Sequence, residues 1–199
     1  VKRIADLVAS AGYVALAPNY YHRTDPDLNE PYTPEGYERG FKVAAQVTRE
    51  TLRKDVSASI AWLNQQEFVK PGKVATWGFC FGGSAAFVTA TVPGLAGAVC
   101  FYGTSIVSGF PSGEPEGVSD GKYISIPLLL AFGGQDDSIP QVQRERLRTT
   151  LDEAGVDYQI QVYPNAGHAF FRGSSANMQS DVVADAWNLV QTFFKKIFK

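Results

Sequence analysis

Apolar and polar residues follow two different rhythms along this chain, and together they predict alternating strands and helices. Short apolar runs bounded by Gly or Pro are typical of strands buried on both faces of a parallel sheet. Such runs predict the strands 13–18, 73–78, 95–102, 127–132 and 158–163. Apolar residues spaced three or four positions apart predict helices, here at 1–11, 48–66, 141–154 and 181–198, with another beginning directly after Cys80.

The order of these elements predicts the fold class. Strands that alternate with helices indicate βαβ units, so we expect an α/β fold with a mostly parallel twisted sheet flanked by helices on both faces. Polar, Tyr- and Pro-rich sequence after residue 18 and Gly/Ser/Pro-rich sequence at 103–120 predict two long loops, the second at the surface. A length of 199 residues favours one domain spanning 1–199.

Composition narrows the classes of function. The net charge of -2 provides no field for a nucleic acid or an anionic membrane, so neither is an expected partner. No apolar run approaches the roughly 20 residues of a membrane span, and no signal-peptide pattern precedes the first helix, so we expect a cytoplasmic protein. The two cysteines, Cys80 and Cys100, lie in segments predicted to be buried or catalytic, which predicts free thiols.

A glycine-rich turn around Cys80 carries the chemistry. The predicted strand ends in Gly78-Phe79-Cys80-Phe81-Gly82-Gly83 and opens into a helix, which is the layout of a nucleophile elbow. We expect side chains at positions 78 and 82 to collide in this turn, and Gly83 to extend the close packing. The helix N-terminus lowers the thiol pKa, and the N–H of Phe81 becomes an oxyanion donor. The alternative is an inert buried thiol.

An acid and a histidine follow the elbow in the order that an α/β-hydrolase fold requires. Asp136 follows the strand 127–132, with Asp137 as a competing candidate, and His168 follows the strand 158–163. The only other histidine, His22, precedes the elbow and is assigned to a pocket rim or the surface. The three residues predict a Cys-His-Asp triad that cleaves an ester or lactone through a thioester. A helix N-cap or turn role is the alternative for Asp136.

Three motifs resemble those of the dienelactone hydrolase family: the cysteine elbow, the Gly-x-x-Asp motif within 133–140, and the Gly-His motif followed by arginine within 167–172. The resemblance runs from Gly12 to the C-terminus and implies the same triad, with Asp136 preferred over Asp137. It also implies hydrolysis of carboxymethylenebutenolide to maleylacetate, as in aromatic degradation.

The resemblance further implies that Arg23 and Arg172 hold a carboxylate of the substrate, for which the planar guanidinium is suited. Ordinary surface charges are the alternative for both arginines. Tyr21 and Phe79 are expected to line an aromatic substrate pocket, although core packing would also explain them. The pattern contains no metal-ligand cluster and no phosphate-binding motif, so no metal and no cofactor is expected.

The chain departs from the family pattern in three places. The first strands, a second oxyanion donor and a glutamate that contacts the thiol have no counterpart before residue 1, so we expect the full protein to be longer. Ala169 stands where a small hydroxyl residue is usual, and Tyr163-Pro164-Asn165 replaces an acidic run. Two other functions stay open: a general carboxylesterase or thioesterase with the same triad, and a non-catalytic protein with a redox-sensing cysteine.

Overall fold

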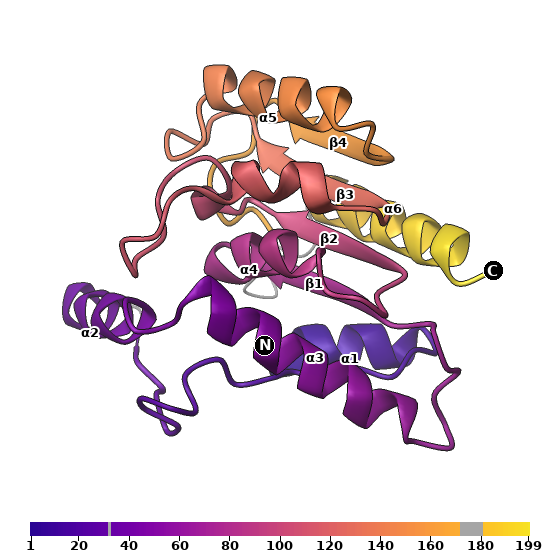
Figure 1. Ribbon diagram of the computed structural model, residues 1–199. Helices are drawn as coiled ribbons and strands as arrows, with labels where there is room; N and C mark the ends of the chain where they lie inside the picture. Colours follow the sequence, from indigo (N-terminus) through magenta and orange to yellow (C-terminus); the bar gives the residue numbers. More distant parts are fainter. Residues whose placement is uncertain (32, 172–180) are drawn as a thin grey trace.

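A parallel sheet forms the centre of the molecule. The computed structural model describes residues 1–31, 33–171 and 181–199. Within these residues the sheet has four strands, in the spatial order β1 (Ala75–Phe79), β2 (Gly97–Phe101), β3 (Leu128–Gly133) and β4 (Tyr158–Tyr163), each parallel to its neighbour (Figure 1). All carboxyl ends of the strands therefore lie at one edge, where loops can converge.

Helices cover both faces of this sheet, as predicted. On one face α4 (Phe81–Thr89) packs against β1 and β2, with α3 (Arg49–Asn64) outside it; α5 (Gln141–Glu153) lies near β4 (Figure 1). On the other face lies α6 (Asp181–Ile197), whose Trp187 stacks on Trp77 of β1 at 5.7 Å between ring centroids. Near it, α1 (Lys2–Ser10) is followed by Tyr13, whose ring meets Phe194 edge-on.

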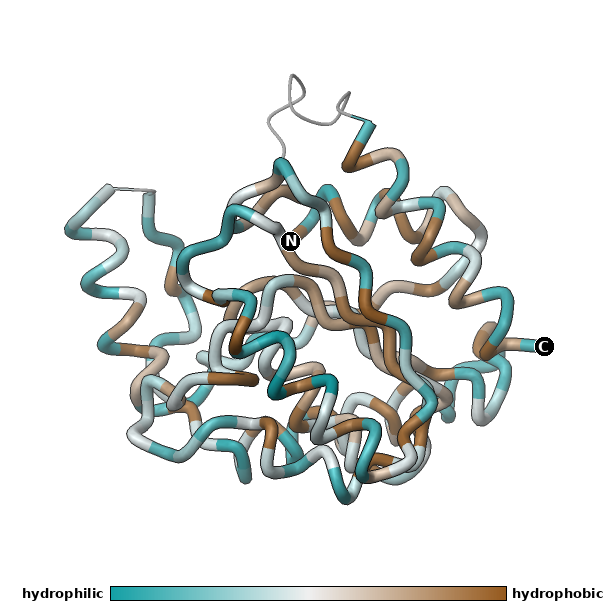
Figure 2. The backbone as a smooth tube through the Cα atoms, turned by 90° about the horizontal axis from the view of Figure 1, so that it is seen from above, coloured by the Kyte–Doolittle hydropathy of each residue, from teal (hydrophilic) through white to brown (hydrophobic). Residues whose placement is uncertain are grey.

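Burial differs between the middle and the edges of the sheet. Every residue of β2 and β3 is buried, whereas β1 and β4 are only partly buried. Figure 2 shows brown, apolar segments running through the centre of the molecule, with more teal, hydrophilic segments toward its outside. Continuous apolar runs in the sequence thus identified the two central strands correctly.

The strand predicted at 13–18 is wrong. These residues are extended but join no ladder, and Val14 and Leu16 are 47% and 41% exposed. A groove of about 100 Å³ between Leu16 and Pro18 on one side and β1 on the other separates the segment from the sheet. An apolar run indicates that the residues favour a strand. A strand also needs a neighbouring backbone within hydrogen-bonding distance, and these residues lack one.

Two loop predictions also need correction. The polar segment after residue 18 contains α2 (Pro34–Ala44), which Thr33 caps by accepting a hydrogen bond from the N–H of Gly36; proline at the first helical position favours this start. The predicted surface loop 103–120 contains two 3-10 helices, η1 (Thr104–Ile106) and η2 (Gly117–Tyr123). Its apolar side chains are buried, namely Ile106, Val107, Phe110 and Val118.

Candidate active site

The turn between β1 and α4 holds Cys80 in an uncommon backbone conformation. Its φ is 53°, in the region that L-residues rarely adopt. A Cβ on Gly78 would lie 1.8 Å from the carbonyl oxygen of Gly82, and one on Gly83 would lie 2.4 Å from that of Phe101. Glycine at 78 and 83 therefore lets strand and helix meet closely enough to raise Cys80 above the sheet.

The collision predicted for a side chain at Gly82 is wrong. Apart from its chain neighbours and the backbone of its own helix, a Cβ there would have no heavy atom within 4 Å, because the backbone of Gly82 approaches Gly78 while its Cβ direction faces open space. The spacing of glycines in the motif indicated a tight turn, but it could not tell which side of each glycine faces the turn.

The structure brings Cys80, His168 and Asp136 together from the ends of three different strands. His168 Nε2 lies 3.3 Å from Cys80 Sγ, and His168 Nδ1 lies 2.7 Å from Asp136 Oδ2. Asp136 is 3% exposed, and its other oxygen accepts a hydrogen bond from the N–H of Ser138 at 2.9 Å. Asp137, the competing candidate, is exposed.

Charge in this cluster favours a thiolate paired with an imidazolium. Desolvation raises the pKa of the Cys80 thiol, but hydrogen bonds and the charge of His168 outweigh it, so the pKa is lowered overall. The hydrogen bond to Cys80 is the largest influence on His168; together with Asp136 it outweighs desolvation and raises the pKa of His168 to about 9. Each group therefore stabilises the charged form of the other.

Two further groups reach the Cys80 sulfur. The backbone N–H of Phe81, at the start of α4, hydrogen-bonds to it and lowers its pKa, while its role as an oxyanion donor stays a prediction. The hydroxyl of Thr104 does the same, and sequence reasoning missed this residue. Thr104 follows β2, the neighbour of β1, so its place after a strand end was the available signal.

The two aromatic residues expected in the substrate pocket lie in different surroundings. The Tyr21 ring stacks on Phe81, with 6.4 Å between centroids, and burial and then the charge of Cys80 raise the pKa of its phenol. Phe79 instead points to the α6 side of β1 and packs on Phe101 and Phe171. Alternation along β1 explains this, since Gly78 faces α4. The structure thus places Tyr21 beside the site and Phe79 in the aromatic core.

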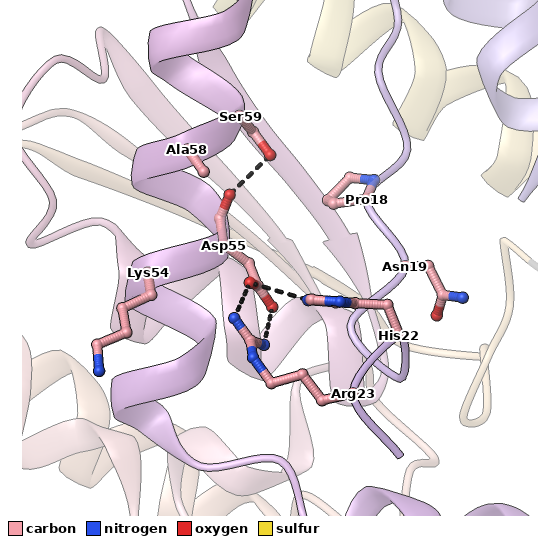
Figure 3. A pocket seen from close by; sticks show the side chains of 8 residues that line it. All are labelled: Pro18, Asn19, His22, Arg23, Lys54, Asp55, Ala58 and Ser59. Carbon is pink, nitrogen blue, oxygen red and sulfur yellow. Dashed lines mark hydrogen bonds and ion pairs between the residues drawn. The ribbon is translucent and has the colours of Figure 1, made fainter. Parts of the chain in front are cut away.

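Arg23 makes a contact that the sequence did not reveal. Its Nη1 and Nη2 donate to the two oxygens of Asp55 on α3 at 2.8 and 2.6 Å, and His22 Nε2 lies 3.3 Å from Asp55 Oδ1 (Figure 3). The three side chains line a cavity of about 510 Å³ with Asn19 and Lys54. His22 therefore lies at a pocket rim, while Arg23 is bound to protein. Arg172 lies outside the described residues.

Comparisons with known proteins now identify the chain's relatives. The family model for the dienelactone hydrolase family matches residues 1–198. The chain belongs to the dienelactone hydrolase family. A relative from Synechocystis sp., named "Putative carboxymethylenebutenolidase", is 34% identical over all of this chain and 81% of its own length. Members of the family hydrolyse esters or lactones of small molecules, and this protein is such an enzyme.

Solved structures of dienelactone hydrolase relatives have the same fold. One from Klebsiella pneumoniae, titled as a "Putative Dienelactone Hydrolase", superposes with a TM-score of 0.84 at 27% identity, over 98% of this chain and 81% of that one. A dienelactone hydrolase-like promiscuous phosphotriesterase from metagenomic libraries gives a TM-score of 0.74 at 22% identity, over 100% and 80% of the two chains. The second shows likeness of fold alone.

A metal site and a membrane span are two further features that a chain of this length can contain. Among the described residues, no group of three or more His, Cys, Asp and Glu side chains is arranged to hold a metal ion. No helix in the described ranges combines the length and apolar character needed to cross a bilayer. Cys80 and Cys100 are both free thiols, as predicted, the first exposed and the second buried.

Proposed function

We propose that this protein hydrolyses its ester or lactone substrate with a triad of Cys80, His168 and Asp136. One observation carries the proposal: an unbroken hydrogen-bonded path runs from Cys80 Sγ through the His168 ring to the buried carboxylate of Asp136. The lowered pKa of Cys80 and the raised pKa of His168 support a thiolate that is ready to attack.

The first half of the reaction forms a thioester. The Cys80 thiolate attacks the carbonyl carbon, a C–S bond forms, and the carbonyl oxygen becomes an oxyanion beside the N–H of Phe81. When the tetrahedral intermediate collapses, the bond to the alkoxy group breaks. The alkoxide takes the proton from His168 Nε2, and Asp136 keeps the ring oriented through Nδ1.

The second half releases the acid. Neutral His168 takes a proton from water while the water oxygen attacks the thioester carbonyl. Collapse then breaks the C–S bond, the acid leaves, and sulfur departs as a thiolate beside a protonated His168. The ion pair is thereby restored, and one water has been consumed per ester bond.

The proposed substrate is a lactone of the dienelactone type that carries a carboxylate. The carboxymethylenebutenolidase name of the relatives supports it. Arg23 and Arg172 would bind the carboxylate, Arg23 with the guanidinium hydrogens that Asp55 leaves available. A carboxylesterase or thioesterase for neutral substrates is the second candidate, supported by the engagement of Arg23 with Asp55 and by the apolar rings of Tyr21 and Phe81.

A nucleophile substitution tests the chemistry. Cys80→Ala should lower kcat/KM for 4-nitrophenyl acetate by at least about a thousandfold, and mass spectrometry of the quenched wild-type reaction should find an acetyl group on Cys80. Cys100→Ala is the matched control, because that thiol is buried and should keep wild-type activity. Hydrolysis that survives Cys80→Ala contradicts the triad. Reversible peroxide oxidation of Cys80 without turnover would favour the redox-sensing alternative.

A second measurement identifies the substrate class. Arg172→Ala should raise KM for carboxymethylenebutenolide by at least about tenfold, since it removes a charged hydrogen-bond donor from the carboxylate. KM for the neutral ester should change by less than about twofold. Equal effects on both substrates would favour the esterase alternative.

A further inference from the structure

A buried carboxylate on α3 holds the loop that reaches the active site. Asp55 is 9% exposed, and both of its oxygens contact Arg23, while one also contacts His22 (Figure 3). Hydrogen bonding and charge from these two residues outweigh desolvation and keep the pKa of Asp55 low. The Asp55 side chain is only 10% exposed, so loss of Arg23 would leave this buried carboxylate with His22 as its remaining partner in this trio.

The loop itself is a compact series of turns. Asn19 accepts a hydrogen bond from the N–H of Tyr21 and donates one to the carbonyl of Pro26. The N–H groups of Thr24 and Asp25 both donate to the carbonyl of Tyr21. These hydrogen bonds tie residues 19–26 together. His22 and Arg23 join this segment to α3, alongside Tyr20, which packs against the cluster of Val56 and Ile60, and Asp25, which pairs with Arg39 of α2.

Tyr21 projects from this unit toward the reaction centre. Its ring stacks on Phe81, the residue that follows Cys80 and supplies the N–H beside the sulfur. Neighbouring residues of one loop thus face two ways: His22 and Arg23 reach back to α3, and Tyr21 reaches forward to the elbow. Displacement of the first contact would be transmitted to the second over one or two residues.

We propose that Asp55 is a positioning residue of the active site, which fastens the loop 19–26 through Arg23 and His22 so that Tyr21 stays against Phe81 and narrows the space around Cys80. This proposal rests on the proposed function, since its effect on rate needs an active Cys80. It does not require Arg23 to touch the substrate.

The experiment is a double-mutant cycle of Asp55→Asn and Tyr21→Ala, read with a neutral ester so that carboxylate binding plays no part. Asp55→Asn should lower kcat/KM roughly tenfold, because misplacement of about 1 Å at a site costs up to a hundredfold. In the Tyr21→Ala background the same substitution should change kcat/KM by less than about twofold. Glu50→Gln is the matched control: it removes a carboxylate that pairs with Lys54 on the same helix, and activity should be unchanged.

A second readout does not depend on turnover. Cys100 is fully buried, so the bulky disulfide reagent DTNB reports on Cys80 in the native protein. In a protein that keeps Tyr21, Asp55→Asn should raise the rate at which DTNB reacts with Cys80 severalfold. In a protein that carries Tyr21→Ala, the same substitution should leave this rate unchanged. The proposal would be overturned if the effects of Asp55→Asn and Tyr21→Ala were additive in both kcat/KM and DTNB rate. It would also be overturned if Asp55→Asn changed neither quantity. A wild type without esterase activity would overturn the proposed function, and the DTNB cycle would then decide the positioning role alone.

Discussion

Two regions of the chain reach the active site by different means. Residues 75–171 bring the proposed triad there on the ends of β1, β3 and β4, next to the fully buried strands β2 and β3. Residues 1–31 contain no strand, and α1 buries none of its residues. Their contribution, Tyr21, is held by side-chain ion pairs to Asp55. The proposed reactive groups are thus placed by the backbone of the sheet, and the aromatic ring beside them by ion pairs between side chains.

The largest expected effect is a difference in activity between substitutions at two adjacent carboxylates, Asp136 and Asp137, which follow β3. Asp136→Asn should lower kcat/KM about a thousandfold, because the amide no longer holds the His168 tautomer and its positive charge. Asp137→Asn should stay within about twofold, since Asp137 is exposed. Steady-state kinetics on one ester measures both, and circular dichroism checks folding. Equal losses would mean that backbone placement does not distinguish the two residues.

A smaller effect is the difference in stability lost when leucine is replaced by alanine in each of the two regions. Leu130→Ala in β3 should lower the free energy of unfolding by about 3 kcal/mol, because it empties a fully buried position. Leu16→Ala should cost less than about 1 kcal/mol, since Leu16 is 41% exposed and borders a groove. Urea unfolding followed by circular dichroism gives both values. A cost at Leu16 equal to that at Leu130 would show that residues 13–18 are packed as firmly as the sheet.

The smallest effect concerns the origin of the site's electrostatics. Cys80 has a lowered pKa, so its alkylation rate by iodoacetamide should rise with pH to a midpoint below the ordinary thiol value of 9.0. His168 keeps its proton up to about 9, so the ion pair exists between these two values. His168→Ala should move the midpoint upward by at least about one pH unit, and Thr104→Val by less. If the midpoint stayed the same in His168→Ala, groups other than His168 would be responsible for the lowered pKa of Cys80.

Sequence reasoning succeeded where the signal was local. Strand runs at β2 and β3, the glycine pattern around Cys80, and the chain order of acid and histidine each depend on residues close in sequence. These signals predicted the fold class and the meeting of Cys80, Asp136 and His168.

Gly82 and the helix α2 were predicted wrongly although their signals are local, but the other failures involve partners that are distant in sequence. Whether 13–18 forms a strand depends on a neighbouring backbone, and Arg23 is held by Asp55, 32 residues away. Thr104 reaches Cys80 only because β1 and β2 are adjacent in the sheet. Propensity and motif spacing carry no information about such contacts, which tertiary packing decides.

The open space at Gly82 makes the elbow a place for redesign. Gly78 and Gly83 are fixed by backbone contacts, but position 82 can accept a side chain without a clash, and its φ is not positive. A residue introduced there would sit in the first turn of α4, two positions from the nucleophile. Libraries at this single position could therefore vary substrate selectivity while the turn that presents the sulfur keeps its shape.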